Sequence, residues 1–137
     1  MVRIGTHNSA TGEAPNGVFS FISIPFARTQ SKTITEQFEN KCRMFDLRVK
    51  RHKNEWKCAH GLFITKKTIW DILDELNFLA QTDEENPVIV NITYEGKLKD
   101  KEQFIKLATD VMNIYRNIQF GDFFTKYPKW QKVFDGN

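Results

Sequence analysis

One apolar run constrains the fold of this chain more than any other stretch: PVIVNITYEG, residues 87–96. The run is nearly continuous and has the length of a strand, which is typical of a strand covered on both faces. Residues 68–80 before it and 99–117 after it carry apolar side chains at helical spacing. A strand between two amphipathic helices predicts parallel α/β architecture.

The rest of the chain continues this alternation of strands and helices. The other predicted elements are a strand at 2–6, a loop at 8–31, a short helix at 34–42, and strands at 44–51 and 55–64 joined as a hairpin. Thr33 and Glu36 have the spacing of a capping box for the short helix. The apolar stripe expected on the last helix consists of Phe104, Leu107, Ala108, Val111, Met112 and Tyr115. The fold class is therefore α/β, with parallel strands, flanking helices and one hairpin strand.

The composition fits one globular domain and excludes several classes of protein. The chain has 137 residues, of which 40% are apolar and 27% charged, and its net charge of +3 is too diffuse to indicate nucleic acid. No run approaches the roughly 18 apolar residues of a membrane span. The opening MVRIGTHNS has no apolar signal region, so we expect a cytoplasmic product, part of a larger assembly, or a fragment without its leader. Cys42 and Cys58 lack zinc-ligand spacing, and we expect two buried free thiols.

Polar residues stand where three of the predicted strands end. His7 and Asn8 follow the first strand. Asp46 and Arg48 share one face of the second strand because they are two residues apart, and His60 lies on the hairpin strand. In α/β barrels the carboxyl ends of the strands converge on one mouth. Two histidines there supply a proton acceptor and a proton donor, and a guanidinium matches phosphate oxygens, so the pattern indicates a phosphodiester site.

Each of these residues also has an ordinary structural explanation. A single histidine near a strand end is usually structural or merely exposed, and Asp46 with Arg48 is also the pattern of a plain ion pair. The short basic stretch at residues 50–53 is typical of a solvated hairpin tip. Only the combination of these residues, in this order along the chain, specifically indicates a catalytic site.

The combination resembles the catalytic X region of phosphatidylinositol-specific phospholipase C and its wider group of phosphodiesterases. The matching stretches are IGTHNSATGE (4–13), QSKTITEQFENKCRMFDLRV (30–49), CAHGL (58–62) and PVIVNITYE (87–95). The resemblance covers residues 4 to about 115. It implies a single domain of residues 1–137 that forms the N-terminal half of a TIM-like (β/α) barrel, followed by an aromatic-rich tail at 118–137.

The resemblance also implies roles for individual residues. His7 is expected to be the general base that activates the inositol 2-hydroxyl. His60 is expected to be the general acid for the departing lipid alkoxide, and Arg48 the clamp on the phosphate. The substrate-binding residues are expected to be Asn8, Asp46 and Glu95.

The same comparison argues against a bound metal. Calcium-dependent members gather the ion with an asparagine and several carboxylates, and Asn8 and Asp46 fit two of those places. Arg48 and Thr93 occupy the others, so the chain is similar to the metal-independent type and no cofactor is expected. Metal-independent members usually have aspartate where this chain has Asn8. Because an amide does not stabilise imidazolium as a carboxylate does, we expect activity lower by about ten- to a thousandfold.

The length of the chain predicts a partner. A closed barrel of this type takes roughly 250 residues, so we expect an open half barrel whose last strand, 87–94, exposes unpaired backbone. Such an edge favours a homo-oligomer, docking on another subunit, or a longer polypeptide. The aromatic tail then covers the edge or meets the partner, with packing against the last helix as the alternative.

Two functions are consistent with these features. The first is a phospholipase C-like phosphodiesterase, without metal, that acts on a phosphoinositide-type phosphodiester and is completed by self-association. The alternative is a non-catalytic structural or interaction module derived from the family, within a larger assembly such as a virion or a multi-subunit complex. Binding of nucleic acid has only the charge of +3 in its favour.

Overall fold

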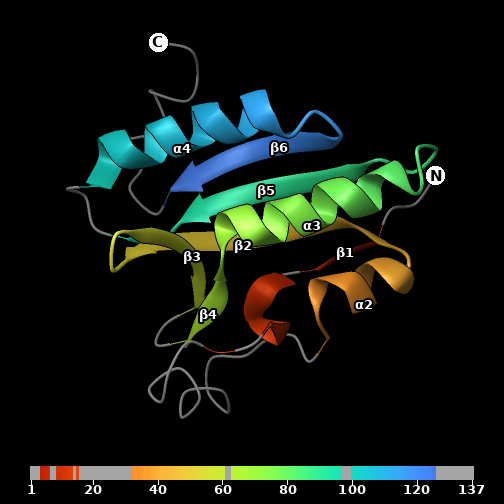
Figure 1. Cartoon of the computed structure of the whole chain (residues 1–137), viewed down its shortest axis with the longest axis horizontal. Coiled ribbons are helices and arrows are strands. Elements are labelled where there is room, and N and C mark those ends of the chain that lie inside the picture. The colour runs from red at the N-terminus through yellow and green to blue at the C-terminus, as the bar shows by residue number, and fades with distance from the viewer. Residues whose placement is uncertain are drawn as a thin grey trace.

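A six-stranded mixed sheet organises the computed structural model, which describes residues 4–6, 9–13, 15, 32–60, 63–96 and 100–125. The strands are β1 (Ile4–Thr6), β2 (Cys42–His52), β3 (Glu55–His60), β4 (Phe63–Thr68), β5 (Val88–Tyr94) and β6 (Ile118–Thr125). β2 pairs in parallel with β1 and β5, and β5 pairs in parallel with β6. The β2–β3 and β3–β4 pairs are antiparallel. The sheet order is β4-β3-β2-β5-β6, with β1 also on β2 (Figure 1), so the predicted α/β class is confirmed, while closure into a half barrel stays a prediction.

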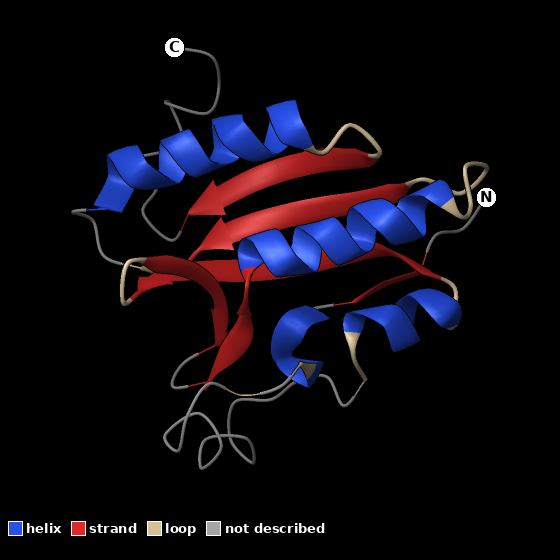
Figure 2. Ribbon diagram, viewed as in Figure 1, coloured by secondary structure: helices blue, strands red, loops and turns tan. Residues whose placement is uncertain are grey.

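Helices on one side of the sheet cover its apolar face (Figure 2). They are a 3-10 turn η1 (Ser9–Gly12), α2 (Ile34–Glu39), α3 (Ile69–Gln81) and α4 (Lys101–Ile114). The predicted capping box at Thr33 and Glu36 is confirmed, and Thr68 with Asp71 forms a second one at the start of α3. Each box satisfies backbone N–H groups that a first helical turn leaves without partners. The predicted long loop begins instead with η1, and its later part, residues 16–31, lies outside the described residues.

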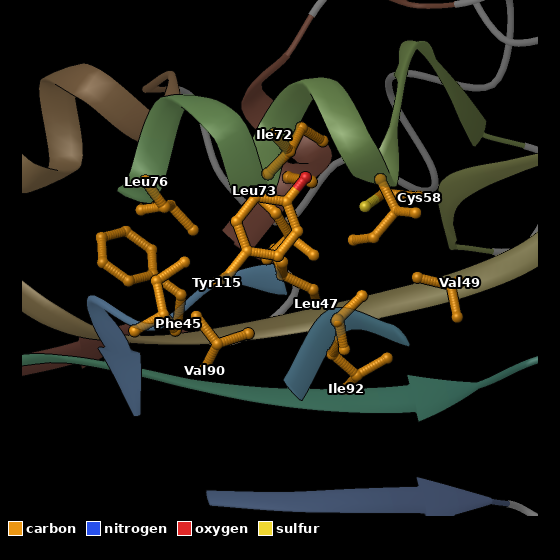
Figure 3. Close-up of a cluster of buried hydrophobic side chains, with 14 of the residues drawn as sticks. Phe45, Leu47, Val49, Cys58, Ile72, Leu73, Leu76, Val90, Ile92 and Tyr115 are labelled. Atoms are coloured by element: carbon orange, nitrogen blue, oxygen red, sulfur yellow. The ribbon is translucent and has the colours of Figure 1, made fainter. Parts of the chain in front are cut away.

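The main core lies between the sheet and helices α3 and α4, and Figure 3 shows its central part. Alternate residues of β2 and β5 enter this core, and so does the inner stripe of each helix. Both cysteines are buried free thiols, as predicted. The labelled side chains are Phe45, Leu47, Val49, Cys58, Ile72, Leu73, Leu76, Val90, Ile92 and Tyr115.

β5 corrects one prediction about burial. The run at 87–96 was expected to be covered on both faces, but burial alternates along the strand. Val90 and Ile92 are fully buried, whereas Asn91 and Thr93 are only partly buried. The period of two follows from strand geometry: one face packs on the helices and the other lines a hollow. Two polar residues within the apolar run therefore mark the face away from the core.

Two further predictions about strands were wrong. The stretch at 55–64 is not one strand, because β3 ends at His60 and β4 begins at Phe63 and pairs back on it. The strand at 87–94 was expected to expose unpaired backbone, but β6, the first part of the aromatic tail, pairs with it in parallel, so the prediction that the tail covers this edge is confirmed. The strand at 87–94 is therefore not the edge of the sheet. The tail aromatics at 127, 130 and 134 lie outside the described residues.

The end of α4 shows how the last helix is attached to α3. The Tyr115 ring stacks on Trp70 with 6.3 Å between centroids, and its hydroxyl donates a 2.7 Å hydrogen bond to Asp74 Oδ1. Burial and the adjacent Asp74 raise the pKa of this hydroxyl. Met112, predicted to lie in the buried stripe, is instead 50% exposed, because it lies at the margin of the stripe, about 80° around α4 from the stripe centre. No helix in the described part of the chain is long and apolar enough to cross a membrane.

Candidate functional site

The polar face of the central strands opens into a cavity of about 500 Å³. Strand alternation produces it, because residues of β2 and β5 that do not enter the core point to the other side of the sheet. Parallel pairing sets Asp46 opposite Asn91 and Arg48 opposite Thr93. The lining residues are Gly5, Thr6, Met44, Phe45, Asp46, Arg48, Asn91 and Thr93.

Arg48 is the one cation among these lining residues, and two carboxylates flank it. Its Nη1 donates a 2.8 Å hydrogen bond to Glu95 Oε1, and its Nε lies 3.7 Å from Asp46 Oδ2. Nε is buried and has no hydrogen-bond partner among the described residues. A buried donor without a partner costs about 1–3 kcal/mol. Arg48 therefore combines a place in the cavity lining with a guanidinium N–H that no described residue satisfies.

A hydrogen-bonded network ties the end of β1 to β2 and α2. The Thr6 hydroxyl donates to Gln37 Oε1 at 2.7 Å and lies 2.6 Å from Ser9 Oγ. Gln37 Nε2 donates to the Ser9 carbonyl at 2.8 Å, and Ser9 Oγ accepts from the Asp46 backbone N–H at 2.9 Å. Ser9 and Gln37 are buried, so each of these groups needs its partner. The network anchors both sides of the short segment between Thr6 and Ser9.

The structure brings together three of the predicted site residues: Asp46, Arg48 and Glu95. His7 and Asn8 lie outside the described residues. His60 ends β3 and is partly buried, but it is not among the described residues that line the cavity. β3 is antiparallel to β2 and pairs with it only from Val49 to His52, so His60 lies beyond the last paired residue.

Asn91 was not identified as a site residue from the sequence. Thr93 was named only as the residue at a position where calcium-dependent members have a metal ligand. Both lie two residues apart on the cavity side of β5. The sequence did contain a signal for them: both are polar residues inside an apolar run. Because they are two residues apart in a strand, they share one face. Among the described residues, no three His, Cys, Asp or Glu side chains gather closely enough to hold a metal ion.

Glu13, the last residue of the stretch GTHNSATGE, directly follows η1 and carries a buried carboxylate. Glu13 is 2% exposed, and its Oε1 is 3.2 Å from Lys67 Nζ, which is also 3.2 Å from Glu75 Oε2. Thr35 donates a hydrogen bond to Glu75. Burial raises the pKa of Glu13, and Lys67 offsets only part of this shift. These four residues thus connect the end of the η1 turn with α2, β4 and α3.

This raised pKa predicts a pH dependence of stability. Because the fold favours the protonated form of Glu13, its contribution is fully present below about pH 4.5 and is lost as the pH rises through the folded-state pKa. Glu13→Gln removes the titration. The free energy of unfolding of this variant, minus that of the unchanged protein, should therefore rise between pH 4 and pH 8 in urea titrations. The exposed Glu102→Gln on α4 is the control and should show a flat difference, and a falling difference for Glu13→Gln would contradict the prediction.

Comparisons with known proteins agree with the fold. The family model for the phosphatidylinositol-specific phospholipase C X domain matches residues 23–125. A phosphatidylinositol-specific phospholipase C from Listeria monocytogenes superposes with a TM-score of 0.62 at 17% identity, covering 80% of this chain and 39% of that one. A structure of the enzyme from Staphylococcus aureus gives 0.64 at 17% identity, covering 89% and 46%. A search of curated proteins finds no match.

A mutant of the Staphylococcus aureus enzyme gives a TM-score of 0.65 at 16% identity, covering 89% of this chain and 46% of that one. Identity at this level establishes similarity of fold alone. The chain spans less than half the length of each of these three solved structures.

Proposed function

This chain belongs to the phosphatidylinositol-specific phospholipase C X-domain family, and from that premise we propose that it cleaves a phosphoinositide-type phosphodiester. One observation carries the proposal: Arg48 lines the cavity between two carboxylates, and its buried Nε has no hydrogen-bond partner among the described residues. A phosphate oxygen is the kind of acceptor that a guanidinium binds best. Such a bond would stabilise negative charge as it develops during cleavage.

The proposed reaction uses two histidines. His7 takes the proton of the inositol 2-hydroxyl, and that oxygen attacks phosphorus. The bond from phosphorus to the lipid oxygen breaks, and His60 donates the proton that the leaving alkoxide needs. The products are a cyclic inositol phosphate and the lipid alcohol, and the step requires no metal ion. Arg48 holds the phosphate throughout.

The remaining proposed site residues orient Arg48 and the substrate. Glu95 keeps Nη1 of Arg48 in place at 2.8 Å, which leaves the other guanidinium N–H groups for the phosphate. Asp46 lies 3.7 Å from Nε and restrains the same guanidinium. Both carboxylates and Asn8 are also proposed to bind headgroup hydroxyls. In this arrangement the two carboxylates keep Arg48 in one orientation, which lowers the ordering cost when phosphate binds.

A partner chain belongs to the proposal as well. β6 is the last strand in the sheet order, so among the described strands it pairs on one side only, with β5. An open strand edge favours pairing with another chain. We propose a homo-oligomer or docking on another subunit. Light scattering of the purified chain measures its molar mass and therefore tests for a homo-oligomer directly.

The assay for the enzymatic proposal is release of inositol phosphate from phosphatidylinositol vesicles. Both His7→Ala and His60→Ala should lower the rate by at least about 100-fold, the usual size of general acid–base catalysis. His52→Ala is the matched control, because His52 ends β2 at the hairpin and should leave the rate unchanged. A chelator should also leave the rate unchanged. Absence of turnover by correctly folded protein would contradict the proposal.

A second candidate function has one observation in its favour. Two carboxylates lie within 3.7 Å of Arg48, so the three side chains together carry one net negative charge that opposes an anionic phosphate. A non-catalytic structural or interaction module derived from the family would keep such an ion-pair cluster for its stability. The same assay separates the candidates, since the module predicts folded protein, no turnover, and no binding of inositol phosphate.

A further inference from the structure

Asn91 is one of the residues that line the cavity, and it has no role in the proposed reaction. It is on β5, directly opposite Asp46 in the parallel register. Its neighbours Val90 and Ile92 are fully buried in the core, so strand alternation directs Asn91 to the cavity side. With strands about 4.8 Å apart and a rise of about 3.3 Å per residue, its Cα lies about 8 Å from that of Arg48.

Gly121 on β6 leaves space for this side chain. A Cβ atom at position 121 would lie 2.3 Å from Asn91 Oδ1 and 3.5 Å from Ile89 Cγ2. The first distance is far shorter than any van der Waals contact, so a larger residue at 121 would displace the Asn91 amide. Gly121 falls where the β5–β6 register shifts between Val90 and Ile92, a position where glycine often marks a close approach. The absence of a side chain at 121 therefore sets where the amide lies.

We infer that Asn91 is a substrate-binding residue that recognises a hydroxyl group beside the phosphate, and that Gly121 is the positioning residue that keeps its amide in the cavity. The amide offers both a donor and an acceptor, which matches a hydroxyl group and not a phosphate oxygen alone. The phosphate would then lie on Arg48 and a neighbouring ring hydroxyl on Asn91. The inference rests on the proposed function and adds one specific contact to the headgroup.

The test compares two ligands by NMR titration of the full chain: myo-inositol 1-phosphate and inorganic phosphate. Asn91→Ala should weaken binding of the inositol phosphate about five- to tenfold, the effect of one lost hydrogen bond, and leave binding of inorganic phosphate unchanged. Gly121→Ala should cause the same selective loss although Asn91 is present. In the double variant the two losses should not add, because both act through one amide.

The possible outcomes distinguish failure of this inference from failure of the proposed function. If the unchanged protein binds neither ligand, the proposed function fails. If it binds inositol phosphate and the Asn91→Ala and Gly121→Ala variants bind equally well, the function stands and the inference is overturned. Equal weakening for both ligands would also overturn it, since that result indicates a general disturbance of the cavity. Asn91→Leu keeps nearly the size of the side chain without its hydrogen-bonding groups, so it tests the same point if Asn91→Ala folds poorly, and it should weaken binding of the inositol phosphate alone.

Discussion

Arg48→Lys should lower kcat/KM for cleavage of phosphatidylinositol by about 100-fold or more. Lysine keeps the positive charge between Asp46 and Glu95, but it cannot hold Glu95 and donate to a phosphate oxygen from one planar group. Removal of one donor to an oxyanion costs about 10²–10³ in rate in other enzymes. The measurement is initial rate against substrate concentration, with the thermal midpoint of unfolding recorded for each variant.

Arg51→Lys is the matched control for this prediction. Arg51 is on the same strand three residues further on, where its guanidinium lies over the Trp56 ring at 5.3 Å and not in the cavity. Its substitution should leave kcat/KM within about twofold. If Arg48→Lys keeps nearly full activity while His7→Ala is inactive, Arg48 is not the phosphate clamp.

Phe104→Ala should lower the free energy of unfolding by about 3–5 kcal/mol, the usual cost of removing a large core side chain. Phe104 has no exposed surface. Its ring lies 4.9 Å from the Tyr94 ring and 6.1 Å from Trp56, so it joins α4 to β5 and β3. Domains of this size are stable by only about 5–15 kcal/mol, so the variant should be close to its unfolding threshold. Urea titration followed by tryptophan fluorescence measures the change.

Phe78→Ala tests whether the effect comes from burial. Phe78 is on α3 and is 67% exposed, so its truncation should change the free energy of unfolding by no more than about 0.5 kcal/mol. If the two variants lose similar stability, the packing of α4 on the sheet differs from the arrangement described here.

Local patterns in the sequence were sufficient for most of the elements. The capping box at Thr33 and Glu36, the helix predicted at 68–80 and the shared face of Asp46 and Arg48 are all present, the helix as α3, Ile69–Gln81. Each depends on residues within about four positions of one another, where helical or strand period has a direct effect. The division of the stretch at 55–64 into two strands was not predicted. It arises because β4 turns back and pairs with β3, and the spacing of apolar residues along this short stretch does not show that turn.

The sequence by itself determined the α/β class, the family and the candidate residues Asp46, Arg48 and Glu95. Only the tertiary structure decided that Arg48 bonds to a residue 47 positions away, that β6 covers β5, and that Gly121 leaves room for Asn91. These contacts depend on which strands are neighbours and in what register, and no periodicity along the chain encodes that. Register is set when the apolar faces of distant segments pack together, so the cavity and the set of residues that line it follow from the assembled sheet.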